Sequence, residues 1–252
     1  MRGVVWTARH LVRTMILRFR EGPGEQLVRH GVPVHPFDRR FGVDTSGLIF
    51  PEDLSSGSRN HLFSSEYIGV PPSLFRSLIS ALEIDHSRFT FLDLGSGKGR
   101  ALMLASEFPF HEVIGVELSP DLHEVACRNL LQFRSSAQRC EALRSVRGDA
   151  TQFPLPGGPL VLYMWNPFCE PVFLQVLENL ENSLRQDPRD VYVLYADAGL
   201  DRHLERSACL SKVWSGEVEM SDDDYAVNPL HARSQLCVTY RSRLVNSQNP
   251  GP

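Results

Sequence analysis

The sequence lacks the marks of membrane, exported and disulfide-stapled proteins. It has no run of about 20 apolar residues of the kind that spans a bilayer, and Arg9, Arg13 and Arg18 interrupt the apolar runs near its start, where a secretory signal would need an unbroken one. Its 5 cysteines include no C-x-x-C pair, which argues against a disulfide framework or a zinc site that can be read from the sequence. We therefore expect reduced thiols and a cytoplasmic protein.

Lysine is scarce, and neither sign of charge dominates. Lys98 and Lys212 are the only lysines, and 26 basic against 30 acidic residues give a net charge of -4. Because nucleic-acid binders usually carry a strong basic excess, a nucleic-acid partner is not expected. The 9 histidines show no H-E-x-x-H or other ligand spacing, so no metal site is expected. A hydrophobic content of 42% with 22% charged residues is typical of a globular protein.

Residues 1–70 are expected to form an N-terminal extension. Its first 20 residues fit a helix with one basic face, made by Arg2, Arg9, Arg13 and Arg20. Such a helix either contacts an anionic membrane or partner as a peripheral element, or packs its apolar side on the main domain. Many glycines and prolines between residues 22 and 58 predict an irregular segment that follows it.

Residues 71–243 are expected to form the main domain, followed by a flexible tail at 244–252. A helix over 71–84 opens the domain, and short apolar runs then alternate with helical stretches. Strands are predicted at 90–94, 112–118, 143–147, 159–165, 191–195, 212–218 and 234–240, and helices at 99–108, 121–133, 171–184 and 201–206. This alternation predicts βαβ units in an α/β fold, with a mostly parallel sheet that ends in an antiparallel hairpin.

The segment FLDLGSGKGR, residues 91–100, carries the strongest chemical signal. A buried strand reaches Asp93, and Gly95, Gly97 and Gly99 then turn the chain into a helix, as a loop must where a ligand approaches the backbone. A Walker loop would need Ser or Thr after Lys98, and glycine stands there. The dinucleotide fingerprint G-x-G-x-x-G would need its third glycine one residue later. The spacing therefore weakens the hypothesis of a nicotinamide cofactor but does not exclude it.

Polar motifs also follow each of the next three predicted strands. Glu117 comes about 20 residues after the glycines, at a spacing suited to accepting the two hydroxyls of a ribose. Gly148-Asp149-Ala150 follows the third strand, and Asn166-Pro167-Phe168 follows the fourth. Since ligands of parallel sheets bind at the carboxyl ends of the strands, we expect these residues to converge.

Together, these motifs resemble those of the class I methyltransferases that depend on S-adenosyl-L-methionine (SAM), over roughly residues 71–240. The resemblance implies a Rossmann-like, doubly wound, mostly parallel seven-stranded sheet with a terminal antiparallel hairpin, to which the N-terminal helical extension is added. It also implies SAM as the cofactor. The cofactor-binding residues that it implies are Asp93, Gly95, Ser96, Gly97, Gly99, Glu117, Leu118, Asp149, Ala150 and Asn166.

A finer resemblance is to bacterial enzymes related to the non-SET histone-lysine methyltransferases, through D-L-G-S-G at 93–97, G-V-E at 115–117 and Asn166-Pro167-Phe168. The last motif is similar to the (Asn/Asp)-Pro-Pro-(Tyr/Phe) motif of amine methyltransferases, although its second proline is absent. The resemblance makes these three residues the catalytic candidates. Asn166 Oδ1 and the Pro167 carbonyl would accept hydrogens of the amine, and Phe168 would supply an apolar wall; alternatively, the three residues only end a strand. The carboxyl region is acidic, so histone or DNA substrates are not expected.

The hypothesis is therefore a methyltransferase acting on an amine, either a protein lysine or a small molecule. The alternatives are an O-methyltransferase, a SAM-binding protein without catalysis, and a nicotinamide-dependent reductase. Two further candidates precede the core, residues 44–47 and Tyr67. They form either a plain structural loop or a lid over the cofactor, and in a lid Asp44 or Tyr67 would contact the cofactor or act as a base.

Overall fold

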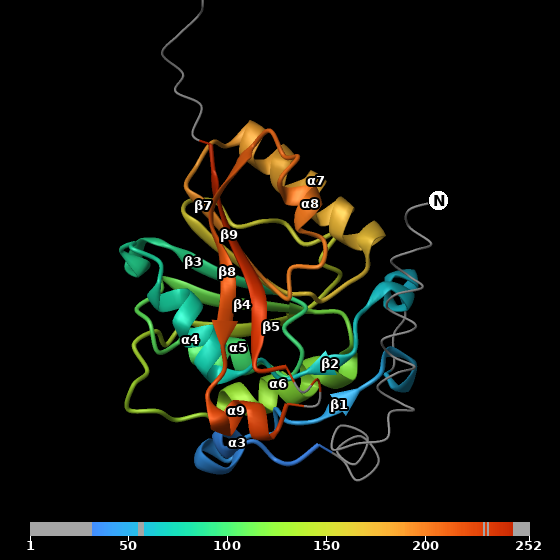
Figure 1. The fold of residues 1–252 in the computed structure, drawn as a ribbon, viewed down its shortest axis with the longest axis vertical. Helices are drawn as coiled ribbons and strands as arrows, with labels where there is room; N and C mark the ends of the chain where they lie inside the picture. The colour runs from blue at the N-terminus through green and yellow to red at the C-terminus, as the bar shows by residue number, and fades with distance from the viewer. Residues whose placement is uncertain (1–31, 55–57, 229, 231, 244–252) are drawn as a thin grey trace, which may run out of the picture.

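The structure, a computed structural model, describes residues 32–54, 58–228, 230 and 232–243 (Figure 1). The predicted arginine helix over the first 20 residues and the predicted tail at 244–252 lie outside the described residues, and both stay predictions. None of the helices in the described ranges combines the length and apolar character that a membrane span needs.

A seven-stranded sheet forms the centre of the molecule, as predicted. Its strands are β3 (Thr90–Leu94), β4 (Glu112–Glu117), β5 (Leu143–Arg147), β6 (Leu160–Trp165), β7 (Val191–Ala196), β8 (Leu210–Glu219) and β9 (Ser234–Ser242). The order across the sheet is β5-β4-β3-β6-β7-β9-β8. The first five strands run parallel, and β9 pairs antiparallel with both β7 and β8. The Rossmann-like α/β fold with a terminal antiparallel pair is thereby confirmed.

Helices cover both faces of this sheet, because its central strands bury side chains on both sides. On β3, Phe91 packs into one hydrophobic cluster and Leu92 into the other. The first cluster contains side chains of α4 (Pro72–Ser80), α5 (Arg100–Ala105) and the end of α6 (Pro120–Gln132). The second contains side chains of α7 (Glu170–Gln186) and α8 (Asp201–Leu204), on the opposite side of the sheet (Figure 1).

The segment before the main domain is more regular than expected. It contains α3 (Pro36–Phe41), the paired strands β1 (Leu48–Ile49) and β2 (Tyr67–Ile68), and the 3-10 turns η1 (Pro51–Asp53) and η2 (Arg59–Phe63). Pro36 begins α3 with a preset φ, His35 accepts a hydrogen bond from the N–H of Phe37, and Gly42 ends the helix at φ 66°. Phe37 stacks on Phe133 with ring centroids 6.1 Å apart, so this segment shares the hydrophobic core of the main domain.

A short helix also interrupts the expected hairpin near the end of the chain. The helix α9 (Asp222–Ala226) lies between β8 and β9, where the sequence predicted two strands in direct succession. Ser221 caps it by accepting a hydrogen bond from the N–H of Asp224. A further 3-10 turn, η3 (His86–Arg88), precedes β3.

Candidate functional site

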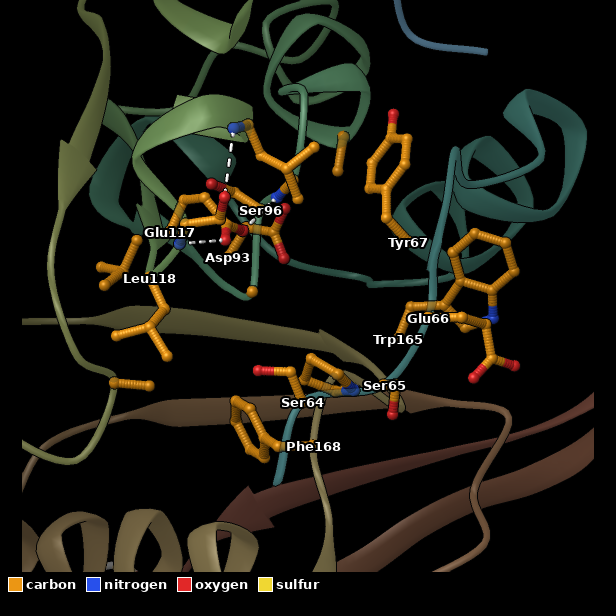
Figure 2. A pocket seen from close by; sticks show the side chains of 18 of the residues that line it. Ser64, Ser65, Glu66, Tyr67, Asp93, Ser96, Glu117, Leu118, Trp165 and Phe168 are labelled. Carbon is orange, nitrogen blue, oxygen red and sulfur yellow. Dashed lines mark hydrogen bonds between the residues drawn. The ribbon is translucent and has the colours of Figure 1, made fainter. Parts of the chain in front are cut away.

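A cleft opens at the carboxyl ends of the parallel strands, where the chain changes direction across the sheet. From β3 the chain continues to β4 and β5 on one side, and it returns to β6 on the other side. Ligands of open α/β sheets bind at such a switch point. The cleft encloses about 1010 Å³, its open mouth included. Figure 2 shows Asp93, Ser96 and Glu117 on one side of it and Glu66 and Tyr67 on another.

The glycines that follow β3 are required by the protein's own packing. Gly95 and Gly97 have φ angles of 83° and 53°, a region that side chains disfavour. A Cβ atom on Gly95 would lie 2.4 Å from Cβ of Pro167, and one on Gly97 would lie 2.3 Å from a ring carbon of Tyr67. Gly99 precedes α5 at φ 84° and packs against Ala126, outside the cleft lining.

Glu117, the last residue of β4, holds the glycine loop in place. Its Oε2 accepts a hydrogen bond of 2.7 Å from the N–H of Gly97, and its Oε1 accepts one of 2.8 Å from the N–H of Ser119. Burial raises the pKa of the Glu117 carboxyl, although these backbone hydrogen bonds oppose the shift. The predicted ribose-binding acid therefore also positions the loop that lines the cleft.

Asp93 lies at the floor of the cleft in an unfavourable setting for a charge. Burial first, and then the nearby charge of Glu117, raise the pKa of Asp93 well above its ordinary value. Asp93 is in register with Tyr163 on β6, whose hydroxyl has no hydrogen-bond partner among the described residues. The hydroxyl of Ser96 is likewise without one there. Buried polar groups are normally paired, so these hydroxyls in the cleft lining indicate a polar ligand.

Asp149 follows β5 and is held from both sides. Its Oδ1 accepts hydrogen bonds from the N–H and the hydroxyl of Thr151, at 2.9 and 2.7 Å. Its Oδ2 accepts one of 2.8 Å from Nδ2 of Asn60. Burial favours a higher pKa for Asp149, but the hydrogen bonds from Thr151 and Asn60 outweigh it and lower the pKa. The carboxylate therefore stays ionised at neutral pH.

Residues 58–69, which we call the strap, form a wall of the cleft that meets the glycine loop at Tyr67. The N–H of Ser65 donates to the carbonyl of Pro167 at 3.0 Å, and the N–H of Cys169 donates to the carbonyl of Phe63 at 2.7 Å. Ser64 and Phe168 form an antiparallel bridge between them. The strap is thus joined to the loop after β6, which places Pro167 and Phe168 in the cleft lining.

Tyr67 and Asp44, the two candidates from the segment before the core, have different positions. Tyr67 lines the cleft and donates its hydroxyl to the carbonyl of Thr45 at 2.7 Å. Burial raises the pKa of Tyr67, so the phenol stays protonated and is unsuited to act as a base. Asp44 does not line the cleft, and its carboxylate pairs with Lys98 Nζ at 2.8 Å. A contact of Asp44 with a cofactor stays a prediction.

Asn166 lies beside the cleft and lines a neighbouring cavity instead. Its Oδ1 accepts a hydrogen bond from the hydroxyl of Tyr195, and its Nδ2 donates to Oδ2 of Asp197, both at 3.1 Å. The two oxygens that were expected to accept amine hydrogens, Asn166 Oδ1 and the Pro167 carbonyl, thus each already have one donor. A carbonyl oxygen accepts two hydrogen bonds, so one acceptor site remains on each.

Most residues predicted for the site line the one cleft. Those that do are Asp93, Gly95, Ser96, Gly97, Glu117, Leu118, Asp149, Ala150, Pro167 and Phe168, and those that do not are Gly99 and Asn166. The prediction missed Asn60, Ser65, Glu66, Tyr163 and Trp165, which also line the cleft. Tyr163 and Trp165 stand just before the Asn-Pro-Phe motif, and that position could have indicated them. The strap residues carry no comparable signal.

The charged residues that line the cleft favour a ligand that has many hydrogen-bond donors or that carries a positive charge. Asp93, Glu117 and Asp149 come from three successive strands, and Arg100 is the only basic side chain among the described residues of the lining. Its Nε donates to Oγ1 of Thr45 at 2.6 Å, so this cation is already paired within the protein. Carboxylates accept hydrogen bonds and repel anions. In the described part of the chain, no cluster of three or more His, Cys, Asp or Glu residues could hold a metal ion.

Comparisons with known proteins give partial similarities. No family model matches the chain, and no curated protein matches it. Among solved structures, an RNA methyltransferase from Salinibacter ruber in complex with S-adenosyl-L-homocysteine is 16% identical, with a TM-score of 0.47, over 73% of this chain and 100% of that one. TrmN from Thermus thermophilus is 14% identical, with a TM-score of 0.47, over 68% of this chain and 48% of that one. The 1320 protein of Thermoplasma acidophilum is 15% identical, with a TM-score of 0.47, over 69% of this chain and 85% of that one.

Proposed function

We propose that the chain is a class I methyltransferase that uses SAM. The observation that carries the proposal is that Asp93, Glu117 and Asp149, from three successive strands, line one cleft at the switch point of the sheet. SAM offers hydrogen-bond donors along its length, in its ammonium group, its ribose hydroxyls and its adenine amine, and it carries a positive sulfonium. A row of carboxyl groups, each with oxygens that accept hydrogen bonds, suits that distribution.

The residues of the cleft fit this cofactor in two places. Glu117 would accept the ribose hydroxyls, and Asp149 would accept the adenine amine in place of its longest hydrogen bond, the one of 3.3 Å from the hydroxyl of Ser58. The unpaired hydroxyl of Tyr163 offers a further partner at the floor. When bound, SAM supplies an activated methyl group on its sulfonium. A dinucleotide fits less well, because its pyrophosphate would face carboxylates without an uncommitted basic group among the described lining residues.

The acceptor in this proposal is an amine, on a protein lysine or a small molecule. Pro167 and Phe168 line the cleft directly beside Asn166, and the resemblance to the amine-methyltransferase motif supports this acceptor. The chain's part in the reaction is to orient the acceptor nitrogen and to exclude water. Transfer to a hydroxyl group is the alternative, and SAM binding without catalysis is another.

Product analysis tests the proposal. The purified chain is incubated with SAM carrying a labelled methyl group and with paired acceptors that differ only in an amine or a hydroxyl group, and the products are identified by mass spectrometry. Label on nitrogen is the expected result, and label on oxygen would replace the amine by the alternative. Binding of SAM without transfer to any acceptor would favour a non-catalytic SAM-binding protein.

A further inference from the structure

A second cavity of about 350 Å³, its open mouth included, adjoins the cofactor cleft. The two share a wall, because Ser65, Glu66 and Trp165 line both. Asn166 and Asp197 line only the second cavity. A molecule in this cavity would therefore lie next to whatever occupies the cleft.

Two residues in strained backbone conformations form one side of this cavity. Asn166 at φ 40° and Asp197 at φ 53° are the only non-glycine residues with positive φ in the described part of the chain. Each directly follows one of the neighbouring strands β6 and β7, and a hydrogen bond of 3.1 Å joins their side chains. This conformation costs about 1–2 kcal/mol per residue, and such strain concentrates at functional sites.

The lining of this cavity is acidic and aromatic. Glu66 and Asp197 bring carboxyl groups to it, and none of its described lining residues is Lys, Arg or His. The indole of Trp165 is fixed by a hydrogen bond of 2.7 Å from its Nε1 to Oε1 of Gln235. Carboxylates attract a cation, and the face of an indole is the strongest cation-binding aromatic surface. The cavity thus suits a positively charged group and disfavours an anion.

We infer that this cavity binds the methyl acceptor, and that the acceptor is an aliphatic primary ammonium group. The inference rests on the proposed function and names the substrate class for it. The ammonium lies between the carboxyl groups of Glu66 and Asp197 and against Trp165. Its nitrogen must lose a proton before it can attack a methyl group, and a carboxylate oxygen in the same cavity accepts that proton. Transfer would then form the bond between nitrogen and the methyl carbon and break the bond between that carbon and sulfur, so that S-adenosylhomocysteine leaves.

Calorimetric titration tests the inference, with and without S-adenosylhomocysteine. The probes are N-acetyl-lysine methylamide, 1,5-diaminopentane and the uncharged isostere N-acetyl-2-aminoheptanoic acid methylamide, in which a methyl group replaces the ammonium. We expect an ammonium probe to bind about tenfold or more tightly than the isostere, as the loss of a charge-assisted contact predicts. Preference for the lysine derivative indicates a protein side chain as the source, and preference for the diamine indicates a small molecule. Equal binding of probe and isostere, or binding of neither, would overturn the inference.

Variants separate this inference from the proposed function. Asp197→Asn should lower the affinity for the ammonium probe about five- to tenfold. It should leave the affinity for S-adenosylhomocysteine unchanged, because Asp197 is outside the cofactor cleft. Glu178→Gln, at an exposed position on α7, is the matched control and should change neither affinity. If Asp197→Asn binds the ammonium probe as tightly as the parent chain does, only this inference is contradicted. If the parent chain does not bind S-adenosylhomocysteine, the proposed function is contradicted.

Discussion

The ring of Tyr67 occupies the space that a side chain on Gly97 would need, with Cε2 only 2.3 Å from the position of a Cβ atom. Tyr67 belongs to the strap and Gly97 to the loop after β3, so these two walls of the cleft are shaped to each other. A substitution in the loop should therefore displace the strap as well as strain the backbone.

Gly97→Ala tests this relationship, with Gly158→Ala as its control. Both glycines have positive φ, 53° and 74°, so either alanine strains the backbone by about 1–2 kcal/mol, but a Cβ atom on Gly158 meets nothing within 4 Å. We expect Gly97→Ala to lose more unfolding free energy than the control and to bind S-adenosylhomocysteine at least about tenfold more weakly. Denaturant unfolding and calorimetry measure the two effects, and equal losses in both variants would argue against the contact.

Asp93→Asn should make the ligand-free protein as stable as the parent or more stable at pH 7. Because the pKa of Asp93 is raised in the folded state, its stabilising contribution is present below its ordinary pKa of 3.8 and is lost as pH rises through the raised value. Asparagine removes the buried charge, so the gain in melting temperature should shrink as the pH is lowered. Thermal unfolding across pH 4–8 checks this, together with a loss of cofactor affinity. A variant less stable than the parent at every pH would contradict it.

Arg100→Lys should destabilise the fold by about 1–3 kcal/mol, the cost of leaving buried hydrogen-bond acceptors unpaired while the positive charge is kept. The Arg100 guanidinium pairs with Asp38 at 3.6 Å and donates to Thr45 Oγ1 at 2.6 Å and to the carbonyls of Gly69 and Val70 at 3.1 and 3.3 Å. One ammonium group cannot reach all of these acceptors.

Denaturant unfolding measures this loss, with Arg128→Lys as control. Arg128 forms an exposed pair with Glu124 on α6, and the same exchange there should cost less than about 1 kcal/mol. If the two variants lose equal amounts of unfolding free energy, the contacts of Arg100 do not stabilise the packing of the N-terminal segment against α5.

Asn166→Ala should separate cofactor binding from turnover. Asn166 lies outside the cleft lining, so affinity for S-adenosylhomocysteine should stay unchanged, while methyl transfer falls about tenfold or more if its amide orients the acceptor. Asn182→Ala, at an exposed position on α7, serves as the control. Unchanged turnover would remove Asn166 from the mechanism, and a parallel loss of cofactor affinity would indicate general damage to the site.

The sheet and the cleft could be predicted because their signals are local. The predicted bounds of β3 and β5 match the structure, since Gly95 directly follows the first of these segments and Gly148 directly follows the second. Asp93, Glu117 and Asp149 stand at or near the ends of their strands, and parallel pairing brings those ends together. The helix α3 also had local signals, Pro36 at its start and Gly42 at its end, but it was too short for its periodicity to show.

The contacts between distant segments could not be predicted. The pairing of Asn60 with Asp149 depends on how the strap crosses the sheet edge. The orientation of Asn166 depends on Tyr195 and Asp197, which belong to another strand and the turn after it. Even the reason for Gly97 was hidden, because its neighbour Tyr67 lies 30 positions earlier in the chain.

Parallel calorimetric titration with SAM, S-adenosylhomocysteine and NAD tests the central claim, that this cleft is a SAM site. The account predicts that the first two bind and NAD does not. It also predicts that Glu117→Ala weakens the binding of both by about 1–3 kcal/mol, the cost of leaving buried polar partners unpaired. Binding of NAD alone, or S-adenosylhomocysteine binding that Glu117→Ala leaves unchanged, would contradict it.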